Sequence, residues 1–222
     1  LGGISNITIA GKSIIPMAYD IGPANGLLDA AIYAYSNGKV SFDEDGKLAA
    51  AGTVDTDLLN VFLNEPYYSL PAPKSTGKEL FHLPYLIERT GPVHSWNIEN
   101  LMATLLELTV ETVAQEVEKN SLSKLYIAGG GSANPVMMKR MQDRLRQCAI
   151  LSISELGIDP RAKESLTVAL IGFLTLHGLP GQIPSCTGAN GERLLGSLTP
   201  GAHPLQVPAV SKIKPTRIRV VN

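Results

Sequence analysis

A short apolar segment, a run of glycines and a capped helix follow one another in the second half of the chain. Residues 125–128 (Leu-Tyr-Ile-Ala) are typical of a buried strand, and residues 129–131 are three consecutive glycines. Asn134 can then cap a helix whose first residue is Pro135, a position at which proline loses no helical hydrogen bond. With this helix continuing to about Gln147, the segment predicts a βα unit, which needs a sheet for its helix to cover.

Further elements repeat this alternation. Residues 149–153 favour another strand, and a strongly apolar helix is expected from about Arg161 to His177. Upstream, residues 98–119 carry an apolar stripe at helical spacing, and Asn97 can cap the helix that they predict. The fold class expected from this pattern is α/β, with helices on the faces of a sheet.

The N-terminal residues predict a hairpin. Residues 4–9 and 13–20 are rich in β-formers and are separated by residues 10–12 (Ala-Gly-Lys). Pro16 is acceptable there if its strand lies at a sheet edge. The second strand is expected to end at Asp20.

A helix should follow the hairpin. Gly22 and Pro23 favour a turn, Asn25 can cap, and apolar residues then recur at helical spacing until Asn37-Gly38. Asp20 therefore lies at a strand end followed by a turn, where α/β proteins place ligand-binding and catalytic groups. Its carboxylate could act as a general base or hold Mg²⁺, and the simpler alternative is a turn residue.

Composition excludes several classes of protein. The 222 residues are 44% hydrophobic and 18% charged, which is typical of a globular chain and not of a disordered or fibrous one. The net charge of −1 gives no footprint for nucleic acid or an anionic membrane surface. Two cysteines, Cys148 and Cys186, are too few for a disulfide framework, so a cytoplasmic location is expected. The most apolar stretch, residues 166–176, is shorter than the roughly 20 residues that cross a bilayer.

Several familiar motifs fail on specific residues. The acidic turn at residues 43–46 is not an EF-hand loop, because Val54 stands where the bidentate glutamate should be. Residues 74–79 are not a Walker motif, because Ala72 replaces a glycine and Glu79 replaces the final Ser/Thr. The four histidines are scattered without a partner cysteine pair, and no GxSxG elbow occurs.

Two glycine clusters are candidates for phosphate binding. Gly2 and Gly3 precede the hairpin, and Gly129, Gly130 and Gly131 lie between a strand and a helix. Glycines let the backbone approach an anion closely, and a helix N-terminus attracts one. For either cluster alone, a tight turn is an equally simple interpretation.

Two further segments carry charge. Glu164 lies in the first turn of the helix expected from residue 161, where a carboxylate also favours the helix dipole. Lys212, Lys214, Arg217 and Arg219 make residues 205–222 a basic tail, for which a solvated terminus is favoured over a binding patch. Residues 1–204 are then expected to form the folded lobe.

Six segments taken together resemble one known family. They are LGGISNITI (1–9), YDIGPANGLLDA (19–30), LPAPKSTGKELF (70–81), ATLLELTVETVA (103–114), LYIAGGGSANPVMM (125–138) and GIDPRAKESLTVALIGF (157–173). In this order and spacing they resemble the C-terminal half of the anhydro-N-acetylmuramic acid kinases, which belong to the actin/Hsp70/sugar-kinase (ASKHA) superfamily. The resemblance covers about residues 1–201.

The resemblance implies a ribonuclease-H-like (ASKHA) lobe with a mixed sheet flanked by helices. Such a lobe closes on ATP and Mg²⁺ together with an N-terminal lobe that this chain lacks, and a homodimer is left open. The family uses ATP and water to convert 1,6-anhydro-N-acetylmuramic acid, an amino sugar, into N-acetylmuramic acid 6-phosphate. The abrupt start at Leu1, without an initiator methionine, is consistent with an incomplete chain.

By the same resemblance, Asp20 is the catalytic aspartate that activates water, and Glu164 matches an acidic active-site position. The positions expected near the nucleotide are Gly2, Gly3, Ser5, Asn6, Gly22, Asn25, Gly129, Gly130, Gly131 and Asn134. No chemical role is assigned to residues 74–77.

The chain departs from the family at a few positions. Ile21 replaces a threonine, Ala24 replaces a glycine, and Ala133 replaces a longer polar residue, so nucleotide affinity could be reduced. Two alternatives to a kinase lobe therefore remain. One is a non-catalytic ASKHA-like nucleotide-binding or interaction module, and the other is an unrelated α/β nucleotide-binding protein that uses the three-glycine turn.

Overall fold

The N-terminal hairpin pairs strand β1 (Ile4–Gly11) with strand β2 (Ile14–Pro23) in a computed structural model that describes residues 1–160, 162–204, 206–211 and 213–218. Side chains alternate along β1, since Ser5, Ile7 and Ile9 are buried and their neighbours are exposed. The turn comes at residues 12–13, later than the predicted 10–12, because strand pairing continues through Gly11.

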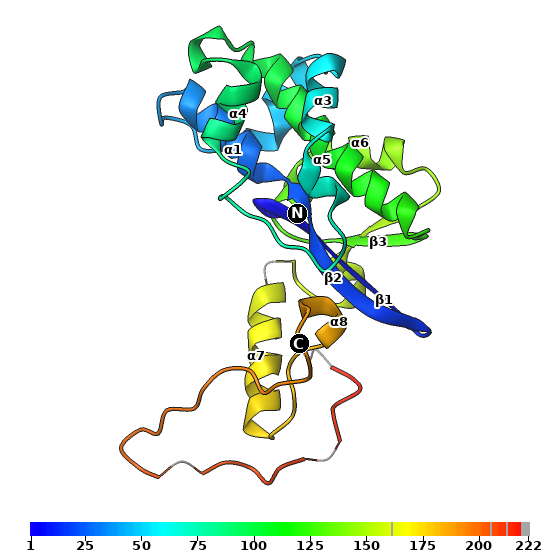
Figure 1. Cartoon of the computed structure of the whole chain (residues 1–222), viewed down its shortest axis with the longest axis vertical. Helices are drawn as coiled ribbons and strands as arrows, with labels where there is room; N and C mark the ends of the chain where they lie inside the picture. The colour runs from blue at the N-terminus through cyan, green and yellow to red at the C-terminus, as the bar shows by residue number, and fades with distance from the viewer. Residues whose placement is uncertain (161, 205, 212, 219–222) are drawn as a thin grey trace. The chain divides into compact units, whose positions relative to one another are not determined.

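The chain divides into two compact units. The first contains Leu1–Ile7 and Tyr19–Ser152, and the second contains Thr8–Ala18 together with the described residues from Ile153 onward. The tip of the hairpin thus belongs to the second unit. Each unit is described separately below (Figure 1).

Helix α5 (Ile98–Lys119) is the centre of the first unit. It contacts α1 (Asn25–Tyr35), α2 (Lys47–Ala51), α3 (Thr56–Leu63) and α6 (Pro135–Arg144), and Figure 1 shows it running through this group. Helix α4 (Leu83–Thr90) contacts α1 and α3. The predicted helix at 98–119 is confirmed, including its cap, because the Asn97 side chain accepts a hydrogen bond from the Asn100 N–H.

The burial of α5 extends beyond the predicted apolar stripe. Thr104, Thr109 and Thr112 are also buried, and each hydroxyl donates to the carbonyl four residues earlier. These bonds satisfy the hydroxyls without water, so threonines can face neighbouring helices. The predicted apolar stripe is therefore confirmed as core, and the buried threonines widen the buried face of α5 beyond it.

The predicted βα unit is confirmed. Strand β3 (Lys124–Ile127) pairs in parallel with β4 (Ala149–Ser152), with Lys124 opposite Ala149 and Ile127 opposite Ser152. A 3₁₀ turn, η4 (Gly130–Ala133), and helix α6 connect them. The helix ends at Arg144, before the predicted Gln147, because a turn bond from the Cys148 N–H to the Leu145 carbonyl leads into β4.

The strands of the described residues form two separate two-stranded sheets, β1–β2 and β3–β4. The expectation of one mixed sheet is therefore not met in these residues, although the α/β class is. The first unit also contains four short 3₁₀ turns. These are η1 (Glu44–Gly46), η2 (Pro66–Ser69), η3 (Val93–Ser95) and η4.

The second unit holds a 3₁₀ turn, η5 (Ile153–Leu156), and helices α7 (Lys163–Leu176) and α8 (Pro184–Thr187). The predicted start of α7 at Arg161 lies outside the described residues. Gly178, with φ of 66°, ends α7 through a bond from the Leu179 N–H to the Leu174 carbonyl. Residues 190–196 contain no helix, and α8 forms earlier in the chain, where Pro184 occupies its first turn.

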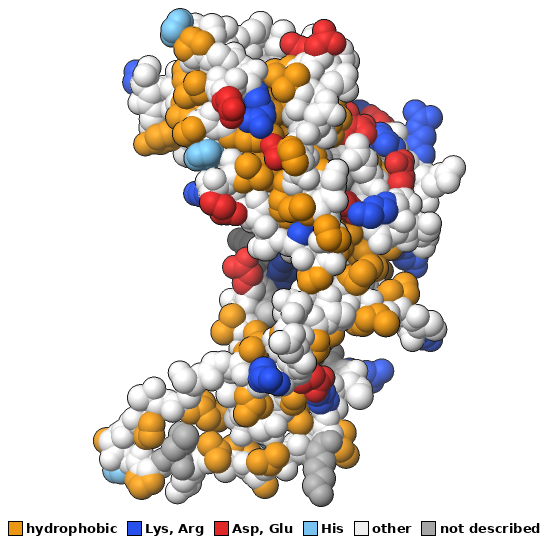
Figure 2. Space-filling model, in the orientation of Figure 1, with side chains coloured by type: hydrophobic (Ala, Val, Ile, Leu, Met, Phe, Trp, Pro, Cys, Tyr) orange, Lys and Arg blue, Asp and Glu red, His pale blue; other side chains and the backbone are white. Residues whose placement is uncertain are grey.

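The basic tail is only partly described, since Lys212 and Arg219 lie outside the described residues. Residues 206–211 and 213–218 contain no helix or strand. On the face of the first unit drawn in Figure 2, acidic and basic side chains are interspersed. In the part of the chain that the structure describes, no helix is long and apolar enough to span a bilayer.

Candidate functional site

Asp20, in the second half of β2, is held through both of its carboxylate oxygens. Oδ1 accepts a hydrogen bond from the Asn6 side-chain amide at 2.9 Å. Oδ2 accepts one from the Ser75 hydroxyl at 3.1 Å and one from the Thr76 backbone N–H at 3.0 Å. The side chain is partly exposed, so these three donors fix its orientation while leaving it accessible.

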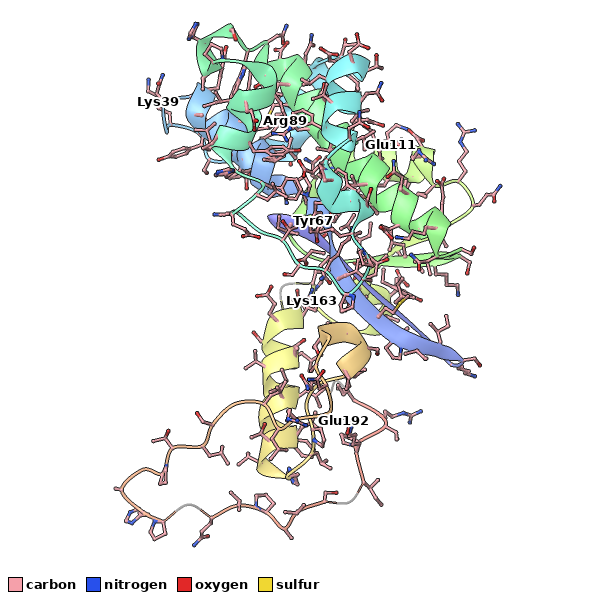
Figure 3. All side chains as sticks on the ribbon, viewed as in Figure 1. Lys39, Tyr67, Arg89, Glu111, Lys163 and Glu192 are labelled. Carbon is pink, nitrogen blue, oxygen red and sulfur yellow. The ribbon has the colours of Figure 1, made fainter. Side chains whose placement is uncertain are left out.

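The backbone of Asp20 is fixed by the same distant segment. The Asp20 N–H donates to the Lys74 carbonyl at 3.0 Å, and the Tyr67 hydroxyl donates to the Asp20 carbonyl at 2.8 Å. Tyr67 is labelled in Figure 3. Residues 67–76, which we call the aspartate loop, therefore contact Asp20 at its N–H, its carbonyl and its carboxylate.

Lys74 makes hydrogen bonds within the aspartate loop. Its ammonium group donates to the carbonyls of Tyr67 (3.2 Å) and Tyr68 (3.0 Å) and lies 4.7 Å from the centre of the Tyr67 ring. Burial lowers the pKa of Lys74. The loop begins in the 3₁₀ turn η2, which ends at Ser69.

Aromatic rings pack behind the loop. Tyr67 and Tyr68 each contact Phe81, with ring centres 6.0 and 6.3 Å apart. Gly22 is required there, because a Cβ atom at this position would lie 2.7 Å from a Tyr68 ring carbon. Burial raises the pKa of both tyrosines, so they remain protonated.

The residue before Asp20 anchors β2 to α5. The Tyr19 hydroxyl donates to Oε2 of the buried Glu116 at 2.7 Å, and the Asn120 amide donates to the Tyr19 hydroxyl at 3.2 Å. Burial, followed by the bond to Glu116, raises the pKa of Tyr19 to about 12. This network fixes the strand on which Asp20 lies.

Three chain segments meet at the first glycine cluster. The Leu1 carbonyl accepts a bond from the Gly131 N–H at 2.9 Å. The Gly2 carbonyl accepts one from Asn25 at 3.0 Å, and the Gly3 carbonyl accepts bonds from the N–H groups of residues 24 and 26. Residues 1–3, 24–26 and 129–131 are therefore neighbours, although they are far apart in sequence.

These bonds correct the capping prediction for Asn25. Asn25 is the first residue of α1, Ala24 occupies the cap position, and no side chain makes a cap hydrogen bond. The carbonyls of Gly2 and Gly3 bond the first N–H groups instead, which makes a side-chain cap unnecessary.

Packing within the chain explains only some of the glycines. Gly129 has φ of 91°, and a Cβ there would lie 2.6 Å from the Leu1 carbonyl oxygen. At Gly131 a Cβ would lie 2.7 Å from the Leu1 Cβ. Both glycines are therefore needed where the turn packs against Leu1.

The other three glycines could carry a side chain without overlap. Gly2, Gly3 and Gly130 are exposed and have no left-handed φ, and a Cβ on any of them would meet its nearest neighbour at 3.7 Å or more, an ordinary van der Waals contact. Nothing in the described chain requires glycine at these positions. Exposed backbone without a side chain allows a phosphate group to approach closely, although the Gly2 N–H already donates to the Ile4 carbonyl at 3.2 Å.

Ser5 and Asn134 use their polar atoms inside the chain. The buried Ser5 hydroxyl donates to the Gly22 carbonyl at 3.0 Å. Asn134 Oδ1 accepts from the N–H groups of Val136 and Met137, so its predicted role as the cap of α6 is confirmed. Their expected contacts with a nucleotide stay predictions.

Glu164 belongs to the second unit, whereas Asp20 belongs to the first. It is exposed in the first turn of α7, as predicted, and its expected place in an active site stays a prediction. Asn6, by contrast, is brought to Asp20 directly.

The residues around Asp20 can be compared with those that usually bind Mg²⁺. Among the described residues, no group of three or more His, Cys, Asp or Glu side chains could hold a metal ion. Mg²⁺ in phosphate-transferring enzymes is usually bound by one or two carboxylates, waters and the substrate phosphates. A single oriented carboxylate fits a cation held largely by a bound nucleotide.

A pocket of about 310 Å³ lies in the second unit, lined in part by Phe173, His177 and Lys214. No carboxylate is among its described lining residues, so it lacks an acidic general base like Asp20.

The sequence did not reveal the aspartate loop as part of the site. Rejecting a Walker motif at residues 74–79 agrees with the structure, in which the Thr76 N–H bonds a carboxylate of the same chain. The available signal was the pair of hydroxyl residues Ser75 and Thr76 beside Gly77, but no local pattern says which distant carboxylate such a loop will contact.

Comparison with known proteins gives a consistent result. The family model described as anhydro-N-acetylmuramic acid kinase matches residues 1–201. Proteins of that name from Streptomyces coelicolor and Rhodococcus erythropolis are each 47% identical to this chain, over 100% and 92% of its length. One from Paraburkholderia xenovorans is 38% identical over 90% of the chain. The chain spans 57%, 53% and 54% of these relatives, about half of each.

Proposed function

Because the chain belongs to the anhydro-N-acetylmuramic acid kinase family, we propose that it forms the C-terminal part of an ATP-dependent kinase for 1,6-anhydro-N-acetylmuramic acid. In this proposal the part folds as a ribonuclease-H-like lobe and acts together with an N-terminal lobe. The relatives support this, since they are nearly twice as long as the matched chain.

The proposed reaction couples hydrolysis with phosphorylation. A water oxygen bonds to the anomeric carbon, the bond from that carbon to O6 breaks, and O6 forms a bond to the γ-phosphorus of ATP as ADP leaves. Asp20 takes a proton from the water as general base. The products are N-acetylmuramic acid 6-phosphate and ADP, and bound Mg²⁺ would supply charge neutralisation at the phosphates.

The orientation of the Asp20 carboxylate is the observation that carries this proposal. Its three donors hold a partly exposed base in one position, which general base catalysis needs. Residues 2–6 contribute to both the aspartate and the glycine parts of the proposed site. The Asn6 amide bonds Asp20, and the Gly2 and Gly3 carbonyls bond the N–H groups at the start of α1. We assign Gly2, Gly3 and Gly130 to the phosphates, and Glu164 to the assembled active site.

Two of the three departures from the family pattern, Ile21 and Ala24, do not favour the non-catalytic alternative. Ile21 is 3% exposed and Ala24 is 1% exposed, so both side chains are part of the core. They therefore do not line the open face beside the exposed glycines. The burial of Ile21 argues against a weaker nucleotide affinity caused by the hydroxyl lost at that position, whereas Ala133 is exposed and its expected effect stays a prediction.

Mass spectrometry of the reaction product tests the proposal. The full-length product of the gene that carries this sequence is incubated with Mg-ATP and 1,6-anhydro-N-acetylmuramic acid. The expected product has gained one phosphoryl group and one water, and in H₂¹⁸O the label appears at the anomeric position. Demonstrable ATP binding without such a product would contradict the proposal.

A further inference from the structure

The aspartate loop makes hydrogen bonds to both the backbone and the carboxylate of Asp20, the proposed base. Four hydrogen bonds join them, two to the backbone of Asp20 and two to its carboxylate. All the residues concerned belong to the first unit. The loop is about 50 residues from Asp20 in sequence, so only the tertiary fold brings the two together.

The two oxygens of the Asp20 carboxylate accept different numbers of hydrogen bonds. Each oxygen of an ionised carboxylate has two acceptor positions. Oδ2 receives both the Ser75 hydroxyl and the Thr76 N–H, so its two positions are filled. Among the described residues, the Asn6 amide is the one donor to Oδ1, which leaves one of its two positions for a further donor.

We propose that Ser75 and the Thr76 N–H are positioning groups for the reaction, which hold Oδ2 of Asp20 so that Oδ1 takes the proton from the attacking water. This inference rests on the proposed function. It adds two positioning groups to the site and selects one of two oxygens as the base. In the transfer, an O–H bond of water breaks, Oδ1 forms a bond to that proton, and the water oxygen bonds to the anomeric carbon.

The construction of the loop supports a positioning role. Lys74 bonds two carbonyls of the loop, and Tyr67 both packs on Phe81 and donates to the Asp20 carbonyl. The donors on Oδ2 therefore project from an anchored backbone. Ser75 itself is exposed, so the fold does not depend on burying its side chain.

Kinetics of the full-length protein test the inference. In Ser75→Ala, we expect kcat to fall about 10- to 100-fold, because a misplaced base slows the chemical step, while KM for ATP and for the anhydrosugar stays within about twofold. Ser75→Thr restores a hydroxyl on the same carbon and should recover most of kcat. Ser95→Ala is the matched control, since the exposed Ser95 hydroxyl bonds only the Pro92 carbonyl; its kcat should be unchanged.

Several results would overturn the inference. These are an unchanged kcat in Ser75→Ala, no recovery in Ser75→Thr, or a fall in kcat that is matched by a rise in both KM values and a loss of melting temperature. Absence of product from the unmodified protein would instead refute the proposed function.

Amide hydrogen exchange tests the contact independently of turnover. If the Thr76 N–H bonds Asp20, its exchange should accelerate about tenfold or more in Asp20→Ala, while the amides of α5 keep their protection and show that the fold is intact. Unchanged protection of the Thr76 amide would overturn the inference whether or not the protein is active.

Discussion

At the scale of single residues, hydrogen bonds from neighbouring groups fix the orientation of the Asp20 carboxylate. Two side chains and one backbone N–H point at it from two directions, Asn6 from β1 and the aspartate loop from the other side. A base that is already oriented loses little freedom when the substrate binds, which lowers the entropic part of the barrier.

Asp20→Asn should therefore lower kcat of the full-length protein by about 10²- to 10⁴-fold, because an amide cannot accept the proton. ATP affinity, measured by calorimetric titration, should stay within about threefold, since the open glycines are unaltered. Asp143→Asn is the control, because Asp143 is an exposed partner of Lys139. Wild-type turnover in Asp20→Asn would remove Asp20 from its role as base.

The glycines of the second cluster divide into two kinds, and alanine substitutions should separate them. Gly130→Ala should leave the free energy of unfolding within about 0.5 kcal/mol, because the new methyl group would lie at an ordinary contact distance of 3.8 Å from the Asn25 amide, yet it should weaken ATP binding measurably. Gly131→Ala should cost about 1–3 kcal/mol, because its Cβ would overlap Leu1. Denaturant titration gives the stabilities, and unchanged ATP affinity in Gly130→Ala would remove that glycine from the phosphate site.

At the scale of secondary structure elements, caps and buried networks fix the elements that carry the site. The N–H groups at the start of α1 are bonded by glycine carbonyls, whereas those of α6 are bonded by the Asn134 side chain. Helix α6 is also tied to α5 by Arg144, which bonds Glu111 and Glu118. These contacts hold the three-glycine turn against the helical core.

Asn134→Ala should destabilise the protein by about 1 kcal/mol, because two N–H groups at the start of α6 lose their acceptor. Asn60→Ala, an exposed change inside α3, should be neutral or slightly stabilising, because alanine is the better helix former. Urea denaturation of both variants measures the difference, and equal stabilities would contradict the cap.

The link between Tyr19 and Glu116 predicts how stability depends on alkaline pH. The folded-state pKa of Tyr19 is about 12, raised from an ordinary value of 10.0, so the folded state disfavours its ionisation. Its contribution to stability is full below pH 10 and is lost as the pH rises toward 12. Tyr19→Phe should reduce the loss of stability across this range, whereas Tyr33→Phe, at an exposed position, should retain it. An identical decline in Tyr19→Phe would contradict this prediction.

At the scale of the whole molecule, the chain accounts for about half of the relatives that it matches. Phosphoryl transfer to a sugar requires both substrates to be enclosed and aligned, and water to be limited to the reacting molecule. The exposed backbone at Gly2, Gly3 and Gly130 is consistent with a site completed by further protein.

We therefore expect the isolated 222-residue chain to form no N-acetylmuramic acid 6-phosphate under conditions in which the full-length gene product does. Circular dichroism would establish that the isolated chain retains its helices during the assay. Turnover by the isolated chain at the full-length rate would show that the chain needs no further lobe.

Local sequence determined much of this protein. The hairpin, the βα unit, the cap at Asn134 and both ends of α5 follow from side-chain periodicity and from bonds between residues a few positions apart. Such bonds form within one element, so the sequence near it is sufficient to predict them. Local sequence also indicated Asp20 as a candidate base, with a turn residue as the alternative, and the family resemblance favoured the catalytic role.

Only the tertiary structure decided which distant groups meet. Ser75 and Thr76 contact Asp20 across more than 50 residues, the Gly2 and Gly3 carbonyls replace a side-chain cap on α1, and buried threonines extend the core face of α5. Each outcome depends on the path of the backbone between two elements, which no short pattern encodes. The residue types at the site were thus visible in the sequence, but the orientation of the proposed base was set by packing of the whole first unit.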